Sequence, residues 1–178
     1  MERPKPYCKN PDKVKVFVLG CDPTAYKKEE RQKPVGQRKH IELDTVFDIG
    51  RDLRYFAGIL NNLKEIGLSQ DDVYVQNLVS DYLEEESSKN KEWIRIAQRY
   101  IPGLIEEFDK IDPSRNTPVL LTSELLYRAL LKDGMKKVSA RDFYELKAEI
   151  PIPPDVNKLG RPLIPFYRHR AYALGDKY

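Results

Sequence analysis

Residues 14–24 read VKVFVLGCDPT and are the most informative part of the 178-residue sequence. The run from Val14 to Leu19 is short and dominated by β-branched and apolar side chains, which is typical of a buried strand. Gly20 ends this run, and Asp22 follows almost at once. In parallel sheets, ligands bind beyond the carboxyl ends of the strands. The stretch therefore predicts a buried strand that presents a carboxylate at a ligand-binding edge.

Three more apolar runs resemble strands, and amphipathic patterns with helical spacing separate them. The expected strands are residues 14–19, 73–75, 118–121 and 163–165, and the expected helices are 53–66, 89–108, 123–131 and 142–146. Gly67 is expected to end the first helix, and Pro102-Gly103 to break the second. Alternating strands and helices predict an α/β fold, a three-layer α/β/α arrangement around a central four-stranded parallel sheet. We expect one domain over residues 1–178, with residues 1–12 as an N-terminal extension.

Composition and charge exclude several classes of protein. The 31 basic residues barely exceed the 28 acidic ones, so a polybasic protein is excluded and any nucleic-acid contact must come from local patches. No run reaches the ~18 apolar residues of a membrane span, and the polar start of the chain does not resemble a signal peptide. With only Cys8 and Cys21 present, one chain cannot build a four-cysteine cluster. We expect no metal, no cofactor and a cytoplasmic protein.

Three of the expected strand ends are followed by polar side chains suited to chemistry: Asp22, Asn77 and His169. Each has an ordinary structural interpretation. An aspartate at a strand end usually caps a turn, an asparagine there commonly satisfies backbone groups, and a histidine between arginines is commonly a solvated surface residue. It is their combination and order along the chain that favour a functional site.

Five segments, in order, resemble motifs of the uracil-DNA glycosylase superfamily. Residues 20–24, GCDPT, are similar to its GQDPYH and GEAPG motifs, and residues 47–51, FDIGR, to its PFVGR segment. Residues 67–77, GLSQDDVYVQN, resemble GLxRxDVYITN of the iron–sulfur branch. Residues 119–131 resemble its VVxLGxxAxxALL strand and helix, and residues 169–172, HRAY, resemble HPAY. The resemblance runs from about Val14 to Leu174, although the cluster cysteines of that branch are missing.

The resemblance implies a role for each matching residue in removing a base that is flipped into a pocket. Asp22 matches the carboxylate that orients water and stabilises the cation-like sugar, and His169 matches the group that hydrogen-bonds a uracil oxygen as it gains charge. Phe47 matches the aromatic ring on which the base stacks. Asn77 matches the residue that reads uracil, because its amide pairs with N3–H and O4, whereas cytosine presents the opposite pattern.

Two further residues concern the choice of base. Cys21 is expected to line the base pocket as a small residue, since no pairing base supports it as a nucleophile. Thr24 stands where the cluster-free enzymes place a tyrosine that excludes the thymine methyl group. Thr24 therefore leaves room for thymine or a larger lesion, unless Tyr26 folds back into that space.

The expected partner is DNA, bound by a monomer. Residues near the histidine are expected to contact phosphates or fill the vacated base position: Lys158, Arg161, Arg168, Arg170 and Tyr172. A second basic group lies in the long loop after the first strand: Lys27, Lys28, Arg31, Lys33, Arg38 and Lys39. The acidic run from Glu84 to Glu86 opposes phosphate binding unless it points away from the pocket.

The predicted function is that of a DNA base-excision N-glycosylase acting on uracil or a related damaged base. Two alternatives stay open. The first is a non-catalytic module that keeps this fold and binds nucleic acid or a protein partner, which Thr24, Arg170 and the acidic run favour. The second is a glycosidase for free nucleosides or nucleotides, which needs no surface that follows a phosphate backbone.

Overall fold

A computed structural model describes residues 1–51, 56–145 and 148–167 of the chain. Four parallel strands form its central sheet, in the order β2-β1-β3-β4. The strands are β1 (Val16–Gly20), β2 (Val73–Asn77), β3 (Val119–Leu121) and β4 (Leu163–Pro165). Every residue of β1 is buried, as expected for a central strand covered on both faces. The predicted fold class, a parallel sheet surrounded by helices in an α/β/α arrangement, is confirmed.

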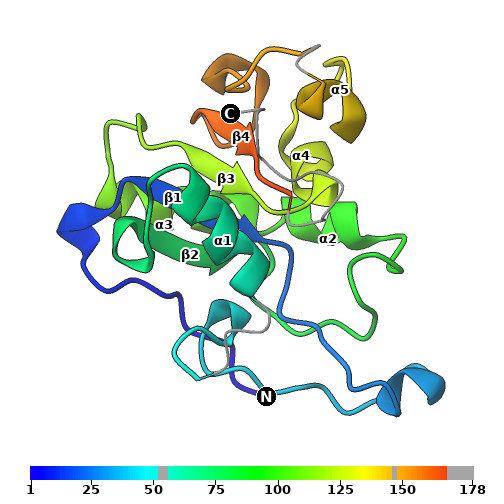
Figure 1. Cartoon of the computed structure of the whole chain (residues 1–178). Helices are drawn as coiled ribbons and strands as arrows, with labels where there is room; N and C mark the ends of the chain where they lie inside the picture. The colour runs from blue at the N-terminus through cyan, green and yellow to red at the C-terminus, as the bar shows by residue number, and fades with distance from the viewer. Residues whose placement is uncertain (52–55, 146–147, 168–178) are drawn as a thin grey trace.

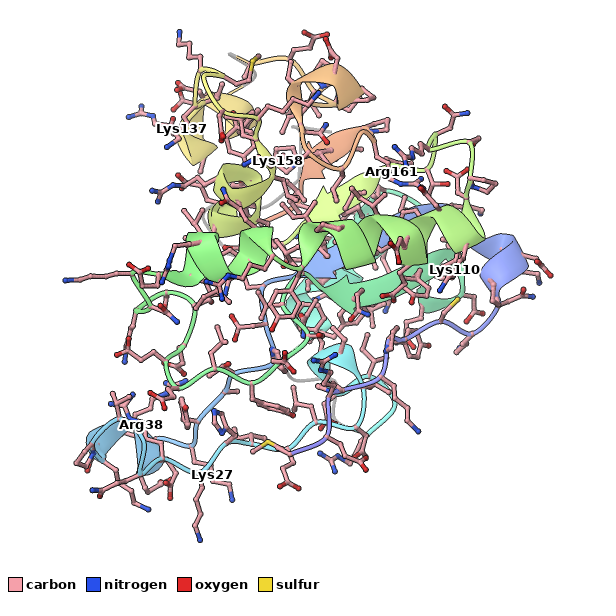
Figure 2. All side chains as sticks on the ribbon, turned by 180° about the vertical axis from the view of Figure 1, so that it is seen from behind. Lys27, Arg38, Lys110, Lys137, Lys158 and Arg161 are labelled. Atoms are coloured by element: carbon pink, nitrogen blue, oxygen red, sulfur yellow. The ribbon has the colours of Figure 1, made fainter. Side chains whose placement is uncertain are left out.

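Five α-helices are described around the sheet: α1 (Ala57–Glu65), α2 (Trp93–Gln98), α3 (Ile101–Ile111), α4 (Glu124–Leu130) and α5 (Ala140–Tyr144). α1 covers one face of the sheet, as Figure 1 shows, while α2 and α3 lie on the opposite face, which is seen from behind in Figure 2. Phe108 of α3 stacks on Phe17 of β1, with ring centroids 4.0 Å apart and nearly parallel planes. Within the described residues, no helix is long and apolar enough to cross a membrane.

Two predicted helix boundaries have different outcomes. Gly67 ends α1 as predicted: its φ is +75°, and the N–H of Leu68 reaches back to the carbonyl of Leu63. The break in the second predicted helix lies earlier than expected, between α2 and α3, and Pro102 falls in the first turn of α3. Proline fits a first turn because no helical hydrogen bond is lost there. The predicted helix start at residue 53 lies outside the described residues.

The N-terminal extension covers an edge of the sheet. Tyr7 and Val75 of β2 exchange two backbone hydrogen bonds, of 3.0 and 2.8 Å, in an isolated antiparallel bridge. Lys5 accepts a hydrogen bond from Val46 N–H at 2.9 Å, and its own N–H donates to the carbonyl of Asp44 at 3.0 Å. The extension therefore protects part of the β2 edge and also holds the segment that leads into Phe47.

The long loop between β1 and α1 contains local structure that the sequence did not predict. Tyr26 and His40 pair in an antiparallel bridge, so the chain leaves and returns at the same place. Between them lies a short 3-10 helix, η2 (Glu30–Gln32), which projects from the sheet at the lower right of Figure 1. A second 3-10 helix, η3 (Val46–Asp48), ends the loop and carries Phe47.

Candidate functional site

The main cleft lies where the topology of the sheet predicts a ligand site. The connection after β1 leads to β2 on one side, whereas the connection after β3 leads to β4 on the other side. The connections that follow these two neighbouring strands therefore diverge. Here the cleft has a volume of about 880 Å³. Its described lining includes five of the predicted site residues: Cys21, Asp22, Thr24, Phe47 and Asn77. The structure thus brings together five residues that are spread over 57 positions, from 21 to 77, of the sequence.

Asp22 lies just beyond the end of β1 as a partly buried carboxylate that accepts two hydrogen bonds. The backbone N–H of Thr24 donates to Oδ1 at 2.9 Å, and the indole N–H of Trp93 donates to Oδ2 at 2.8 Å. Burial raises the pKa of Asp22 above its ordinary value, hydrogen bonds from Thr24 and Trp93 oppose this rise, and the Glu86 carboxylate adds to it. A carboxylate held in one orientation and less acidic than usual is suited to accept a proton or to stabilise a developing cation.

Asn77 ends β2 with a buried amide oxygen that lacks a hydrogen-bond donor among the described residues. Its residue is 4 % exposed, and its Oδ1 has no hydrogen-bond partner within the described structure. Buried polar atoms without a partner are rare in proteins, because desolvation costs about 1–3 kcal/mol. Since Asn77 also lines the cleft, a ligand N–H can supply the missing donor.

Gly20 allows Asn77 and Phe47 to share one small space. A Cβ atom at Gly20 would lie 2.2 Å from Asn77 Oδ1 and 2.7 Å from Phe47 Cζ. Such distances are far below ordinary contact, so only glycine fits between these two side chains at the end of β1. The amide oxygen and the ring edge therefore lie against the same face of Gly20.

Phe47 adopts an unusual backbone conformation. Its φ is +58°, and that of the next residue, Asp48, is +55°. Positive φ is disfavoured for side chains with a Cβ and tends to occur at functional sites. The Thr45 hydroxyl donates to the carbonyl of Ile49 at 2.6 Å and closes the loop around Phe47. Two consecutive residues with positive φ therefore lie where the Phe47 ring lines the cleft.

Tyr26 does not fold back into the space beside Thr24. Its side chain is 3 % exposed, and its hydroxyl lies 2.8 Å from the Glu84 carbonyl and 2.8 Å from His40 Nε2. Thr24 lines the cleft, and its hydroxyl oxygen accepts a hydrogen bond from Leu83 N–H at 2.8 Å. The space beside Thr24 is therefore not filled by Tyr26.

Two predicted phosphate contacts are described, and one of them is wrong. Arg161 is 1 % exposed, and its guanidinium pairs with Asp109 at 2.7 Å and Asp112 at 2.9 Å, beside α3 in Figure 2. Because this cation is enclosed by the core, it cannot reach a nucleic-acid backbone. Lys158 pairs with Asp133 at 3.2 Å and lies at the opposite end of the molecule from Lys27 and Arg38 (Figure 2). The other predicted contacts, Arg168, Arg170 and Tyr172, lie outside the described residues, as does His169.

We expect Arg161→Ala to destabilise the protein by about 3–5 kcal/mol, because it leaves two carboxylates beside the core without their shared cation. The guanidinium also lies 5.2 Å from the centre of the Phe17 ring, so packing is lost as well. Urea unfolding measures the change. The control is Arg115→Ala, which removes an exposed partner of Asp109 and should cost less than about 1 kcal/mol. Equal losses in the two variants would contradict a structural role for the buried cation.

Sequence reasoning missed Trp93 and did not establish the placement of Glu86. Trp93 is the only tryptophan and is 1 % exposed, and a buried indole N–H normally needs an acceptor. That need was the one available signal of its bond to Asp22. Glu86 does not point away from the cleft: it lines the cleft and pairs with Arg31 at 2.8 Å.

The described residues contain no cluster of three or more His, Cys, Asp or Glu side chains placed to hold a metal ion. No model of a known protein family matches the sequence, and no curated protein is significantly similar to it. The case for a function therefore rests on the chemistry of the cleft and on the order of the motifs.

Proposed function

We propose that this chain is a DNA base-excision N-glycosylase that hydrolyses the bond between deoxyribose and uracil or a related damaged base. The observation that carries the proposal is the Asn77 amide, which is buried at the cleft with Oδ1 lacking a donor. Uracil offers N3–H to this oxygen, and its O4 can accept from the amide NH₂. Cytosine has an acceptor at N3 and leaves the oxygen unpaired, which is the kind of mismatch that discriminates strongly.

The neighbours of Asn77 supply the other requirements of the reaction. Phe47 places an aromatic ring in the same cleft, on which an extruded base can stack. Asp22 holds a carboxylate at the same cleft, where it can orient a water molecule and stabilise positive charge on the sugar. The cleft volume of about 880 Å³ leaves space for a sugar and phosphate beside the base. On the resemblance alone, the proposal assigns to His169 the hydrogen bond to the uracil oxygen that gains negative charge as the base leaves.

Release of free base from oligonucleotides tests this proposal. Strands containing uracil, hypoxanthine or an oxidised pyrimidine are incubated with the protein, both single-stranded and in duplexes with uracil opposite guanine. We expect release of uracil. If pure, folded protein releases none of these bases, the proposed reaction is wrong and the non-catalytic binding module becomes the better interpretation.

One observation favours a second candidate, a glycosidase for free nucleosides or nucleotides. Among its described lining residues, the cleft has three carboxylates, Asp22, Glu86 and Glu124, and one cation, Arg31. A negative lining opposes a polyanionic strand but not a nucleoside. Turnover of a deoxyuridine-containing strand that is insensitive to salt, with equal turnover of free deoxyuridine, would favour this candidate over the first.

We expect Trp93→Phe to shift the acid limb of the kcat/KM profile to higher pH. The Trp93 N–H lowers the pKa of Asp22 by stabilising its charged form, so loss of that donor raises the pKa further and leaves less carboxylate at low pH. On the acid limb we expect a loss of about tenfold, the equivalent of one hydrogen bond of ~1.4 kcal/mol. Tyr100→Phe is the control, because its hydroxyl donates to Asp81 instead. An unshifted acid limb with a uniformly lower rate would contradict this positioning role.

A further inference from the structure

Arg31 is the only cation among the described residues that line the cleft. It belongs to η2, in a loop that we call the basic lobe, residues 27–39. Its guanidinium pairs with Glu86, which also lines the cleft, with 2.8 Å between Nη2 and Oε1. The Arg31 side chain is 51 % exposed, whereas that of Glu86 is 18 % exposed. One side of the pair is thus open to a ligand that enters from solvent.

We propose that Arg31 binds a phosphate group of the substrate at the mouth of the cleft, and that Glu86 occupies the same guanidinium in the free protein. The inference rests on the proposed function and adds to it a phosphate subsite. The phosphate belongs either to the strand on which the target base lies or to a free nucleotide. In both cases the group that Arg31 recognises is the same.

The exchange of Glu86 for a phosphate is energetically easy. A half-exposed ion pair is worth about 0–1 kcal/mol, so little stability is lost when it opens. Arginine binds phosphate through two parallel N–H bonds, which are stronger and more directional than a single contact. Glu86 does not lose every counter-charge, because Lys89 Nζ lies 3.7 Å from its other oxygen. Lys89 can therefore compensate the carboxylate after Arg31 has turned to the ligand.

The charge of the basic lobe supports a phosphate partner. Its thirteen residues include six lysines and arginines and two glutamates, a net charge of +4, whereas the whole chain carries +3. The lobe projects from the sheet, and Figure 2 shows Lys27 and Arg38 on it at the lower left. Lys27 and Lys28 are exposed, so phosphates that follow the one at Arg31 meet further cations. Apart from Arg31, the described residues that line the cleft include no lysine or arginine.

The exchange also affects the electrostatics at Asp22. Glu86 is one of the charges that raise the pKa of Asp22, and Arg31 is the cation that pairs with Glu86 at the cleft. A bound phosphate and Glu86 are both negative and repel each other, and Lys89, whose Nζ lies 3.7 Å from Glu86 Oε2, remains as a counter-charge. Substrate binding then draws Glu86 toward Lys89.

Binding of a strand that cannot be cleaved tests the subsite without requiring activity. The probe is a fluorescent single-stranded 12-mer with one 2′-fluoro-2′-deoxyuridine, since the fluorine destabilises a cation-like sugar. Its affinity is measured by anisotropy over a range of NaCl concentrations. We expect Arg31→Gln to weaken binding about tenfold at low salt and to reduce the salt slope by about 0.7, the value for one phosphate contact on a single strand. We expect Glu86→Gln to tighten binding about threefold, because the competing carboxylate is gone.

The matched control is Lys33→Gln. Lys33 lies in the same lobe, pairs with Glu30 at 2.7 Å and is not among the residues that line the cleft, so this variant removes one charge and one ion pair without touching the mouth. Equal effects of Arg31→Gln and Lys33→Gln on affinity and salt slope would overturn the subsite. A Glu86→Gln protein that binds no more tightly than the natural chain would overturn the role of Glu86 as the competing group.

A second arm distinguishes the two sources of phosphate. Deoxyuridine and deoxyuridine 5′-monophosphate are compared by calorimetry with the natural chain and Arg31→Gln. If the monophosphate binds more tightly only when Arg31 is present, Arg31 holds the phosphate of the nucleotide itself. If only the 12-mer responds, Arg31 holds a neighbouring phosphate of the strand. Base release from ordinary deoxyuridine strands is scored separately, so Arg31-dependent binding without release overturns the glycosylase function and leaves the subsite standing.

Discussion

Asp22→Asn protein is expected to bind a uracil-containing strand as tightly as the natural chain and to release uracil about a thousandfold more slowly. The substitution keeps the shape of the side chain and removes the negative charge that orients water and stabilises the sugar cation. Losses of 10²–10⁴ are typical when such a group is removed. Base release is measured in single-turnover reactions, so that product release does not hide the chemical step.

Glu124→Gln is the matched control for Asp22→Asn. Glu124 lines the same cleft at the start of α4, but it is exposed, and no role in the reaction is predicted for it. We expect Glu124→Gln to release uracil at a rate within threefold of that of the natural chain. Burial raises the pKa of Asp22, which means that the folded protein holds this charge at a cost in stability. Asp22→Asn removes that cost and also loses an accepted hydrogen bond. Because the two effects on stability oppose each other, the unfolding temperature should change by only a few degrees. A folded Asp22→Asn protein with an unchanged rate would contradict the assigned role.

The same variant separates the enzyme from the non-catalytic module. A module that only binds nucleic acid or a protein partner does not need a charged group at the end of β1. For such a module, Asp22→Asn leaves affinity unchanged and there is no base release to lose. The enzyme interpretation requires that the natural chain releases the base, and that Asp22→Asn loses this release while it still binds the strand.

Gly20→Ala is expected to lower the rate of base release by about a hundredfold or more. The new methyl group would lie 2.2 Å from Asn77 Oδ1 and 2.7 Å from Phe47 Cζ, so at least one of them must move. Displacements of about 1 Å at positioning groups commonly cost 10²-fold in rate. Steady-state kinetics on a uracil-containing strand, together with thermal unfolding, measure the effect.

Gly103→Ala is the control, because it adds the same methyl group at a position where there is open space. Gly103 is an exposed position in α3, and nothing lies within 4 Å of the Cβ that would be added. Alanine favours a helix over glycine by about 1 kcal/mol, so this variant should be slightly stabilised and fully active. If Gly20→Ala also keeps full activity, Asn77 and Phe47 are not held together for function.

The strands and the position of the cleft were predictable because their signals are local. Continuous β-branched runs identify β1 and β2 wherever they lie in the chain, and a parallel sheet places their carboxyl ends together. Asp22 and Asn77 stand at or just after the ends of those runs, which predicted that they lie close together. The structure confirms that both line one cleft. The helix predicted for residues 123–131 was expected to begin at Thr122 or Ser123, and Ser123 is the N-cap, whose hydroxyl accepts the N–H of Leu125.

Long-range partners were not predictable in the same way. The bond between Asp22 and Trp93 joins residues 71 positions apart, and no sequence pattern pairs an indole with a particular carboxylate. Arg161 was misplaced because an arginine in a polar segment ordinarily faces solvent, and its burial depends on Asp109 and Asp112 at the end of α3. Backbone strain at Phe47 was equally invisible, since nothing in the local sequence requires a positive φ there.

The most direct test of the central claim, that Asn77 reads a flipped uracil, is a comparison of uracil and cytosine release by the natural chain and by Asn77→Asp. A carboxyl group in place of the amide accepts a hydrogen bond from the cytosine amino group and no longer donates to uracil O4. We predict that the natural chain releases uracil and not cytosine, and that Asn77→Asp loses most uracil release and gains measurable cytosine release. No uracil release by the natural chain, or an unchanged ratio of uracil to cytosine release in Asn77→Asp, would contradict the claim.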